Sequence, residues 1–451
     1  MKTINPRHKY SFFDKTSRRV TINETYKMCG RRVPEFRDDC FRQKYSERIG
    51  LLSKVSMKFL WIILLSFLFL QGCAQKSNFT PPKKVQYGDQ RTRHYFPKLL
   101  HKKTAILANH TSIIDGIHLL DTLLRSKINV IKVFSPEHGF RGNAGAGELV
   151  KSNIDNQTGI PIISLYGKHK KPSREDLKDV EILVFDIQDV GVRFYTYIST
   201  LGLVMEACAE NHIPVIVLDR PNPHDGYIDG PVLDLKFKSF VGMYPIPVVY
   251  GLTIGELAQM INGEGWLKNG IQCDLTIIKN QNYSHSIECP VKVAPSPNLP
   301  CMTSIKLYPS LCFFEGTPIS IGRGTASPFQ MYGSPDFCGG DTTFTPVPIR
   351  GVAKHPKYEG KLCKGFDLSD SANIQVQKGK INLRWLLTSY QQYDSTKAFF
   401  TPFFDLLAGT DQLKNQIISG LSETQIRDLW KPKLKKYNQI RKKYLLYQDN
   451  K

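Results

Sequence analysis

Residues 181–200 read Glu-Ile-Leu-Val-Phe-Asp-Ile-Gln-Asp-Val-Gly-Val-Arg-Phe-Tyr-Thr-Tyr-Ile-Ser-Thr, and this stretch decides the fold. It begins with a short β-rich run at 181–186, continues through a polar loop and leads into residues 196–211, whose apolar side chains recur at helical spacing. One face of this expected helix carries Leu201, Val204, Met205 and Cys208. A strand, a polar loop and a covering helix make one unit of a parallel α/β sheet.

The same alternation extends in both directions along the chain. Further β-rich runs occupy residues 104–108, 129–134, 160–164 and 214–219, and residues 114–125 show helical spacing. The sequence therefore predicts a Rossmann-like parallel sheet domain over residues 98–280, followed by a smaller C-terminal α+β domain over residues 281–451 that completes a cleft. No dinucleotide site is expected, because the first strand runs into Asn109-His110-Thr111-Ser112 and not into a GxGxxG turn.

The composition excludes several classes of function. With 451 residues and 41% hydrophobic side chains, the chain has enough apolar material for globular domains. The formal charge of +21 is spread without a Lys/Arg block interleaved with aromatic residues, so no nucleic-acid partner is expected. The ten Cys contain no CxxC pair and no zinc-finger spacing, so neither a structural metal nor a cofactor is expected.

An apolar run near the start predicts a membrane anchor. Residues 57–70 form a Lys-led run of signal-peptide length that ends in Leu70-Gln71-Gly72-Cys73, which looks like a bacterial lipobox. We expect a signal peptide at 57–72, lipidation at Cys73 and a linker over 73–97. The expected location is the cell envelope, at the periplasmic face of the outer membrane, because Ala74 and Gln75 lack the acidic residue that often retains such proteins at the inner membrane.

Residues 1–56 are polar, hold 14 Lys/Arg against 6 Asp/Glu, and lack helical or strand periodicity. They are expected to be a non-native or disordered extension ahead of a true start at Met57. The alternative is a cytoplasmic extension before a signal-anchor helix.

Polar side chains follow five expected strands in succession, where ligands bind in open parallel sheets. The segments that hold them are Asn109 and residues 135–142, 165–167, 186–195 and 219–223. One polar strand end is weak evidence, since such a residue often caps the next helix. Five in succession predict a polar cleft.

These segments carry a close resemblance to a known family. The matching stretches are SPEHGFRG (135–142), AGE (146–148), SLYG (164–167), FDIQDVGVRFYTYIST (185–200), LDRPNP (218–223), YGLTIGELAQMIN (250–262), PSPNLP (295–300) and EGTPISIGRGTASPF (315–329). In this order, within residues 103–447, they resemble the NamZ-type exo-β-N-acetylmuramidases, a family once catalogued as a domain of unknown function. The resemblance implies an exo-acting glycosidase that releases N-acetylmuramic acid (MurNAc) from the non-reducing ends of peptidoglycan fragments.

Cleavage of a glycosidic bond requires a proton donor for the leaving oxygen. Glu137 and Glu148 are the candidates, because both lie in a Gly-rich loop after the second strand. His138 can hold or tune its neighbour Glu137. The alternative is that either Glu pairs with a nearby Arg and is structural.

The substrate's own groups suggest further site residues. The 2-acetamido oxygen can attack the anomeric carbon if a carboxylate orients the amide, and Asp186 or Asp189 is the candidate; the alternative is that Asp186 caps the following turn. The lactyl carboxylate needs a planar cation. The candidates for that cation are Arg141, Arg193 and Arg323, the last between Gly322 and Gly324, which allow a ligand to approach the backbone.

The remaining candidate substrate contacts are aromatic and amide side chains. Tyr side chains can stack on a sugar ring and amides can bind its hydroxyl groups, although each can also be part of the core. The candidates are Tyr166, Tyr195, Tyr197, Asn109, His138, Gln188, Asn222 and Asn298.

Two rival functions stay open at this stage. The first is a metal-dependent envelope hydrolase, although no HExxH motif is present. Its candidate ligands are His110, Asp115, His118, His138, Asp186 and Asp189. The second is a non-catalytic cell-wall glycan-binding lipoprotein, which would need the Tyr and Arg contacts but neither Glu137 nor Glu148.

Overall fold

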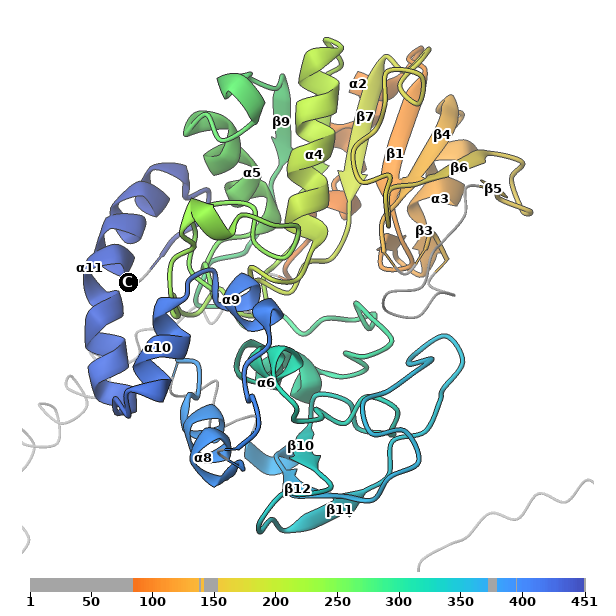
Figure 1. The fold of residues 1–451 in the computed structure, drawn as a ribbon. Coiled ribbons are helices and arrows are strands. Elements are labelled where there is room, and N and C mark those ends of the chain that lie inside the picture. The colour runs from red at the N-terminus through yellow and green to blue at the C-terminus, as the bar shows by residue number, and fades with distance from the viewer. Residues whose placement is uncertain (1–83, 138, 142–152, 372–378, 395, 450–451) are drawn as a thin grey trace, which may run out of the picture. The chain divides into compact units, whose positions relative to one another are not determined.

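The structure, a computed structural model, describes residues 84–137, 139–141, 153–371, 379–394 and 396–449. Its centre is a seven-stranded sheet in the order β5-β6-β4-β1-β7-β8-β9 (Figure 1). The strands are β1 (Thr104–Ala108), β4 (Val130–Ser135), β5 (Asn153–Ile154), β6 (Pro161–Ser164), β7 (Ile182–Asp186), β8 (Val215–Leu218) and β9 (Leu275–Ile278). All neighbouring pairs are parallel except β5 with β6. The predicted parallel α/β architecture is confirmed.

Five of these strands lie within one residue of the predicted ranges at each end. The helix predicted over 114–125 is wrong in its first half, because β2 (Ile113–Ile114) and β3 (Ile117–His118) form a short antiparallel hairpin. The turn of that hairpin holds Asp115 and Gly116 at φ 48° and 87°, which a right-handed helix cannot accommodate. The helix α3 (Leu119–Arg125) begins only after it, with the His118 side chain as its N-cap.

Helices cover both faces of the sheet (Figure 1). The strands alternate their side chains accordingly: Ala105 and Leu107 of β1 belong to one apolar cluster, and Ile106 and Ala108 to the other. The first cluster includes α4 (Tyr197–Glu210) and α5 (Ile254–Gly263), and the second includes α2 (Phe96–Leu99) and α3. The predicted inner face of α4, from Leu201 to Cys208, is fully buried.

A smaller α+β part follows, as predicted. It contains an antiparallel sheet in the order β10-β12-β11, together with short helices. The elements are β10 (Met331–Ser334), β11 (Thr342–Phe344), β12 (Cys363–Asp367), α6 (Met302–Leu311), α8 (Arg384–Gln392), α9 (Pro402–Ala408) and α10 (Gln412–Ile418).

The last helix, α11 (Glu423–Arg441), returns to the first part of the chain and lies on the outer side of α5 (Figure 1). Its Tyr437 hydroxyl donates to the carbonyl oxygen of Tyr250 at 2.6 Å, and Arg441 Nε donates to that of Gly251 at 2.7 Å. The C-terminal region therefore stabilises both parts, and the domain boundary predicted at residue 280 stays a prediction. No helix of the described ranges is long and apolar enough to cross a bilayer.

A buried histidine and Glu256 of α5 connect the end of the chain after α11 to α5. His285 Nε2 donates to Glu256 at 3.0 Å, and its Nδ1 lies 3.4 Å from Asp225. The same Glu256 carboxylate accepts a hydrogen bond from the backbone N–H of Leu446. Burial alone lowers the pKa of His285, but the hydrogen bonds and charges of the two carboxylates outweigh burial and raise it to about 9.

The contacts of His285 with Glu256 and Asp225 predict that the protein loses stability at alkaline pH. The pKa of His285 is higher in the folded than in the unfolded chain, so its contribution is complete below pH 6.5 and is lost as the pH rises through about 9. Between pH 6 and pH 10 the wild type should lose up to about 3 kcal/mol of unfolding free energy through this group. The measurement is urea unfolding at both pH values for the wild type and His285→Gln. An equal pH dependence in the two proteins would contradict the assignment.

Candidate active site

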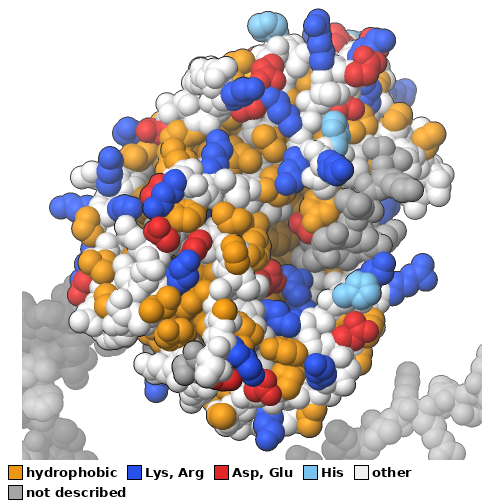
Figure 2. All heavy atoms as spheres, in the orientation of Figure 1, with side chains coloured by type: hydrophobic (Ala, Val, Ile, Leu, Met, Phe, Trp, Pro, Cys, Tyr) orange, Lys and Arg blue, Asp and Glu red, His pale blue; other side chains and the backbone are white. Residues whose placement is uncertain are grey.

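A cavity of about 1060 Å³ lies between the carboxyl ends of the parallel strands and the smaller part of the protein. The face in Figure 2 is hollowed at its centre, between the two parts of the ribbon in Figure 1. The sheet contributes the residues that follow β4, β6 and β7, as expected for ligand sites in open parallel sheets. The polar and aromatic lining residues include Glu137, Tyr166, Tyr195, Thr196, Tyr197, Asn298, Glu315, Arg323, Lys354, His355 and Lys357.

Glu137 is a carboxyl group on the sheet side of this cavity. It follows β4 directly, and its Oε2 accepts a hydrogen bond from the Thr196 hydroxyl at 3.4 Å. The side chain is only half-buried, so it can meet a ligand in the cavity. This position is consistent with the proton-donor role predicted for it, which stays a prediction.

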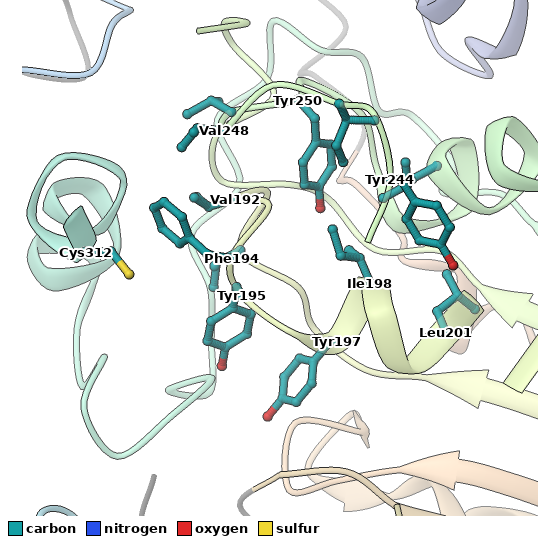
Figure 3. Close-up of a cluster of buried hydrophobic side chains, with 14 of the residues drawn as sticks. Val192, Phe194, Tyr195, Tyr197, Ile198, Leu201, Tyr244, Val248, Tyr250 and Cys312 are labelled. Carbon is teal, nitrogen blue, oxygen red and sulfur yellow. The ribbon is translucent and has the colours of Figure 1, made fainter. Parts of the chain in front are cut away.

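Tyr195 and Tyr197 form the neighbouring wall, ahead of and at the start of α4. Figure 3 shows the two rings leaving the same segment with their hydroxyls directed to the same side. The rings meet edge to face at 4.9 Å, and the Tyr195 hydroxyl donates to the carbonyl oxygen of Pro295 at 2.7 Å. Asn109 lies behind this wall, where its Nδ2 donates to the Tyr197 hydroxyl at 2.9 Å. Asn109 therefore positions a cavity residue and does not itself line the cavity.

The opposite wall carries a carboxylate next to a guanidinium. Arg323 Nε donates to Glu315 Oε1 at 2.7 Å, and its Nη2 donates to the same oxygen. The guanidinium also lies over the Phe329 ring, 5.0 Å from its centre. Burial opposes the charge of Arg323, but Glu315 outweighs burial and raises the pKa of Arg323. The Arg323 guanidinium therefore stays charged at neutral pH.

Sequence reasoning missed Glu315. Glu315 is the first residue of the family-like segment EGTPISIGRG, which also contains Arg323, so the sequence did single out this region. No known residue spacing, however, predicts that the two side chains form a pair. The flanking glycines also act differently from the expectation. A Cβ on Gly322 would meet Met331 and Ser327, and one on Gly324 would meet Pro356 and Val347. These two glycines permit close packing of the protein, not the approach of a ligand.

The segment from 351 to 357 closes this side of the cavity. Lys357 Nζ donates to the carbonyl oxygens of Phe314, Thr317 and Ile319 at 3.4, 2.5 and 3.0 Å. Asn298 Nδ2 donates to the carbonyl oxygen of Val352 at 2.9 Å. The segment is thus held on two sides, and it presents Lys354 and His355 to the cavity. Together with Arg323, this wall is cationic.

Asp186 does not line the cavity. It is fully buried, and both of its oxygens accept hydrogen bonds from Arg220, at 2.6 and 3.0 Å. Arg220 also binds Asp89 at 2.8 Å, and burial raises the pKa of Asp89 to about 6. The amide-orienting role predicted for Asp186 has no contact with the cavity to support it.

Three further predicted residues form a buried framework behind the cavity. Asp189 accepts hydrogen bonds from the Tyr250 hydroxyl and from the backbone N–H of Gly191, and burial raises its pKa to about 7. Gln188 Nε2 donates to two backbone carbonyls, and Asn222 Nδ2 donates to that of Leu252. These side chains hold loops in place, and none of them is among the cavity residues.

The two other predicted arginines are also engaged elsewhere. Arg193 is fully buried and donates to the carbonyl oxygens of Pro231, Ile246, Leu407 and Ala408 at 2.7 to 2.9 Å. Arg141 pairs with Asp155 at 2.9 Å and lines a second cavity of about 450 Å³. Of the three arginines predicted to bind the lactyl carboxylate, Arg323 is the one in the large cavity.

Three predicted residues, Cys73, His138 and Glu148, lie outside the described residues. Among the residues that are described, no three His, Cys, Asp or Glu side chains gather into a potential metal site. His118, a candidate ligand, caps α3, and its Nε2 hydrogen-bonds the carbonyl oxygen of Asn109 at 2.9 Å.

Comparisons with known proteins agree with the sequence resemblance. Residues 104–303 match the family described as exo-beta-N-acetylmuramidase NamZ, N-terminal, and residues 306–447 match its C-terminal counterpart. The peptidoglycan beta-N-acetylmuramidase NamZ of Bacillus subtilis (strain 168) is 39% identical over 393 residues, which cover 82% of this chain and 94% of that protein.

Two solved structures share the fold. Both are DUF1343 family proteins from Bacteroides fragilis NCTC 9343, and each match covers 82% of this chain and 100% of the other. One has a TM-score of 0.76 at 48% identity, and the other has a TM-score of 0.66 at 29% identity. The chain belongs to the NamZ exo-beta-N-acetylmuramidase family.

Proposed function

We propose that this protein is an exo-acting glycoside hydrolase that releases MurNAc from the non-reducing ends of peptidoglycan fragments. The observation that carries the proposal is the composition of the large cavity, which has a carboxyl group, Glu137, on one wall and a cationic wall around Arg323 and Lys354. A glycosidase needs a carboxyl group to protonate the leaving oxygen, and the carboxylate of an acidic sugar needs a cationic wall to bind it.

Glu137 is proposed as the general acid. It donates a proton to the glycosidic oxygen as the bond to the anomeric carbon breaks, and positive charge develops on the sugar ring. The 2-acetamido oxygen attacks the anomeric carbon as the leaving oxygen departs with the proton. Water then adds to the anomeric carbon, breaks its bond to the acetamido oxygen and gives its proton to the Glu137 carboxylate, which restores the acid. Tyr166 and Tyr195 line the cavity and are proposed to pack against the sugar.

The Glu315–Arg323 pair is proposed to bind the two groups that distinguish MurNAc. In this sugar the acetamide and the lactyl ether stand on neighbouring ring carbons, so their recognition groups must also be neighbours. Glu315 accepts the amide N–H and orients the acetamide, and Arg323 binds the lactyl carboxylate. The 2.7 Å contact between the two side chains supports this arrangement. The orienting role predicted for Asp186 or Asp189 thus moves to Glu315, which lines the cavity.

Turnover of chromogenic β-glycosides tests the function. The wild type should release MurNAc, and should cleave the N-acetylglucosamine analogue, which lacks the lactyl carboxylate, about ten- to a hundredfold less efficiently by kcat/KM. Arg323→Leu should remove most of that preference. Arg350→Leu is the matched control, because Arg350 is exposed and does not line the cavity. Tight binding of MurNAc glycosides without any turnover would favour the non-catalytic glycan-binding alternative instead.

We also propose that the protein is lipid-anchored through Cys73 to the periplasmic face of the outer membrane. The order of a Lys-led start, an apolar core and a terminal Cys over residues 57–73 supports the anchor. Mass spectrometry of the mature protein should find an acylated Cys73 at the N-terminus. Any peptide from residues 1–72 in the mature protein would contradict this proposal.

A further inference from the structure

The inner face of α11 is fixed to the rest of the protein. Ile426, Trp430, Tyr437 and Arg441 are buried, and the hydrogen bonds from Tyr437 and Arg441 to the loop before α5 hold the helix in one orientation. The direction of its outer face is therefore fixed as well.

That outer face carries lysines. Residues 429–448 contain six Lys and one Arg but no Asp or Glu. At 3.6 residues per turn, Lys431 and Lys435 fall in one row of α11, and Lys436 lies beside it. The short 3-10 turn that follows α11, Lys442–Tyr444, adds Lys442 and Lys443. We call these five residues the lysine face; all five are exposed.

The lysine face is only weakly neutralised. Lys431 pairs with Asp428 at 2.6 Å and Lys443 with Glu264 at 3.2 Å. Lys435, Lys436 and Lys442 form no salt bridge with any residue in the part of the chain that the structure describes. From Lys431 to Lys443 the face extends about 18 Å along the helix.

The described chain begins close to one end of this face. The Asn282 side chain donates to the carbonyl oxygen of Lys84 at 3.1 Å, and Val85 packs against the cluster that contains Tyr283 and Tyr447. Tyr447 is only four residues beyond Lys443, a distance of at most about 14 Å even for a fully extended chain. Ten residues lie between Cys73 and Lys84, so these two residues are at most about 40 Å apart. An anchor on Cys73 would therefore join the folded part of the protein beside this end of the lysine face.

The opposite half of the molecule carries the active site. Glu137 and Tyr166 follow β4 and β6, next to the β5 edge of the sheet. Helix α11 lies beyond α5, on the side of the β9 edge (Figure 1). A membrane in contact with α11 would leave the cavity open to a glycan substrate.

We infer that the lysine face of α11 binds the surface of an anionic phospholipid membrane. Charge complementarity and the position where the described chain begins support this occupant. The inference goes beyond the proposed hydrolase function and depends on neither catalysis nor acylation, because the attraction between exposed lysines and anionic headgroups acts on the folded protein alone.

Vesicle binding of an unacylated chain, residues 74–451, tests the inference. Residues 81–451 form one compact unit, so this chain retains the whole fold. At about 0.1 M salt it should bind vesicles that contain a quarter of phosphatidylglycerol at least about tenfold more strongly than pure phosphatidylcholine vesicles, because each lysine at such a surface contributes about fivefold. High salt should abolish the difference.

A triple charge reversal, K435E/K436E/K442E, should lower binding to the anionic vesicles more than about tenfold. The matched control is K98E/K238E/K361E, which makes the same change of net charge at three exposed lysines on other elements. This control should retain binding within about threefold, and both variants should cleave a MurNAc glycoside like the wild type.

Three outcomes would overturn the inference. They are equal binding of the wild type to both kinds of vesicle, an equal loss in the two triple variants, or a loss in the α11 variant of binding to purified peptidoglycan but not to vesicles. The last outcome would assign the lysine face to the glycan.

Discussion

Replacing Glu137 by Gln is expected to lower kcat on a MurNAc β-glycoside by about 10²- to 10⁴-fold, the usual contribution of a positioned general acid. The amide keeps the size and the hydrogen-bonding capacity of the side chain but has no proton to give. Because Glu137 is half-buried and glutamine can still accept the hydrogen bond from the Thr196 hydroxyl, the fold should tolerate the change. The measurement is steady-state kinetics together with a thermal unfolding midpoint.

The leaving group supplies the decisive control. Dinitrophenolate is a stable anion and leaves a glycoside without being protonated. Glu137→Gln should therefore cleave a dinitrophenyl MurNAc glycoside at a rate close to that of the wild type. Glu175→Gln is the matched surface variant, since the Glu175 side chain is 85% exposed and lies on another element. If Glu148→Gln shows this leaving-group dependence and Glu137→Gln does not, Glu148 is the acid.

The sequence predicts the strands that are buried on both faces. β1 and β7 consist entirely of buried residues, and such strands appear in a sequence as continuous apolar runs. β9 is only half-buried over most of its length, so its pattern is weak and the prediction omitted it. The helix predicted from residue 114 failed for a different reason, because the apolar spacing continued through Ile114 and Ile117 although the Asp-Gly pair between them is a hairpin signal.

The site was predictable only in part. Ligands bind beyond the carboxyl ends of parallel strands, which locates the site, but this tendency does not say which side chains point into it. Glu137 follows the parallel strand β4 and Asp186 is the last residue of the parallel strand β7, yet the first lines the cavity and the second binds Arg220. Arg220 belongs to the strand-end segment 219–223 that the sequence placed beside Asp186. Its second partner, Asp89, lies in the predicted linker, which the sequence gives no reason to place there. The sequence did not predict Glu315, because this residue follows α6 in the smaller part of the protein, where no parallel strand ends.

Arg193 also lies at a predicted strand end but points into the core. Arg193→Met is expected to lower the free energy of unfolding by about 3 to 5 kcal/mol. The guanidinium binds four buried carbonyl oxygens, two of which belong to Leu407 and Ala408 at the end of α9, more than two hundred residues away. Methionine fills a similar volume but offers no donor to these carbonyl oxygens. Within the described ranges, only that of Ile246 keeps another hydrogen bond, from the backbone N–H of Leu233. Gly409, at φ 69°, already brings the backbone against the guanidinium, so the region has little room to relax.

Urea unfolding and KM together separate this structural role from the predicted binding of the lactyl carboxylate. A structural role predicts a large loss of stability while the folded fraction keeps the KM of the wild type within about threefold. Arg91→Met is the matched control, because Arg91 donates near the surface to one carbonyl oxygen, that of Lys279, and to the His94 ring, and the change should cost about 1 kcal/mol. Wild-type stability of Arg193→Met with a KM raised about tenfold or more would instead place the guanidinium in contact with the substrate. Since every donor contact of Arg193 described above ends on a backbone carbonyl, the structural outcome is the one expected.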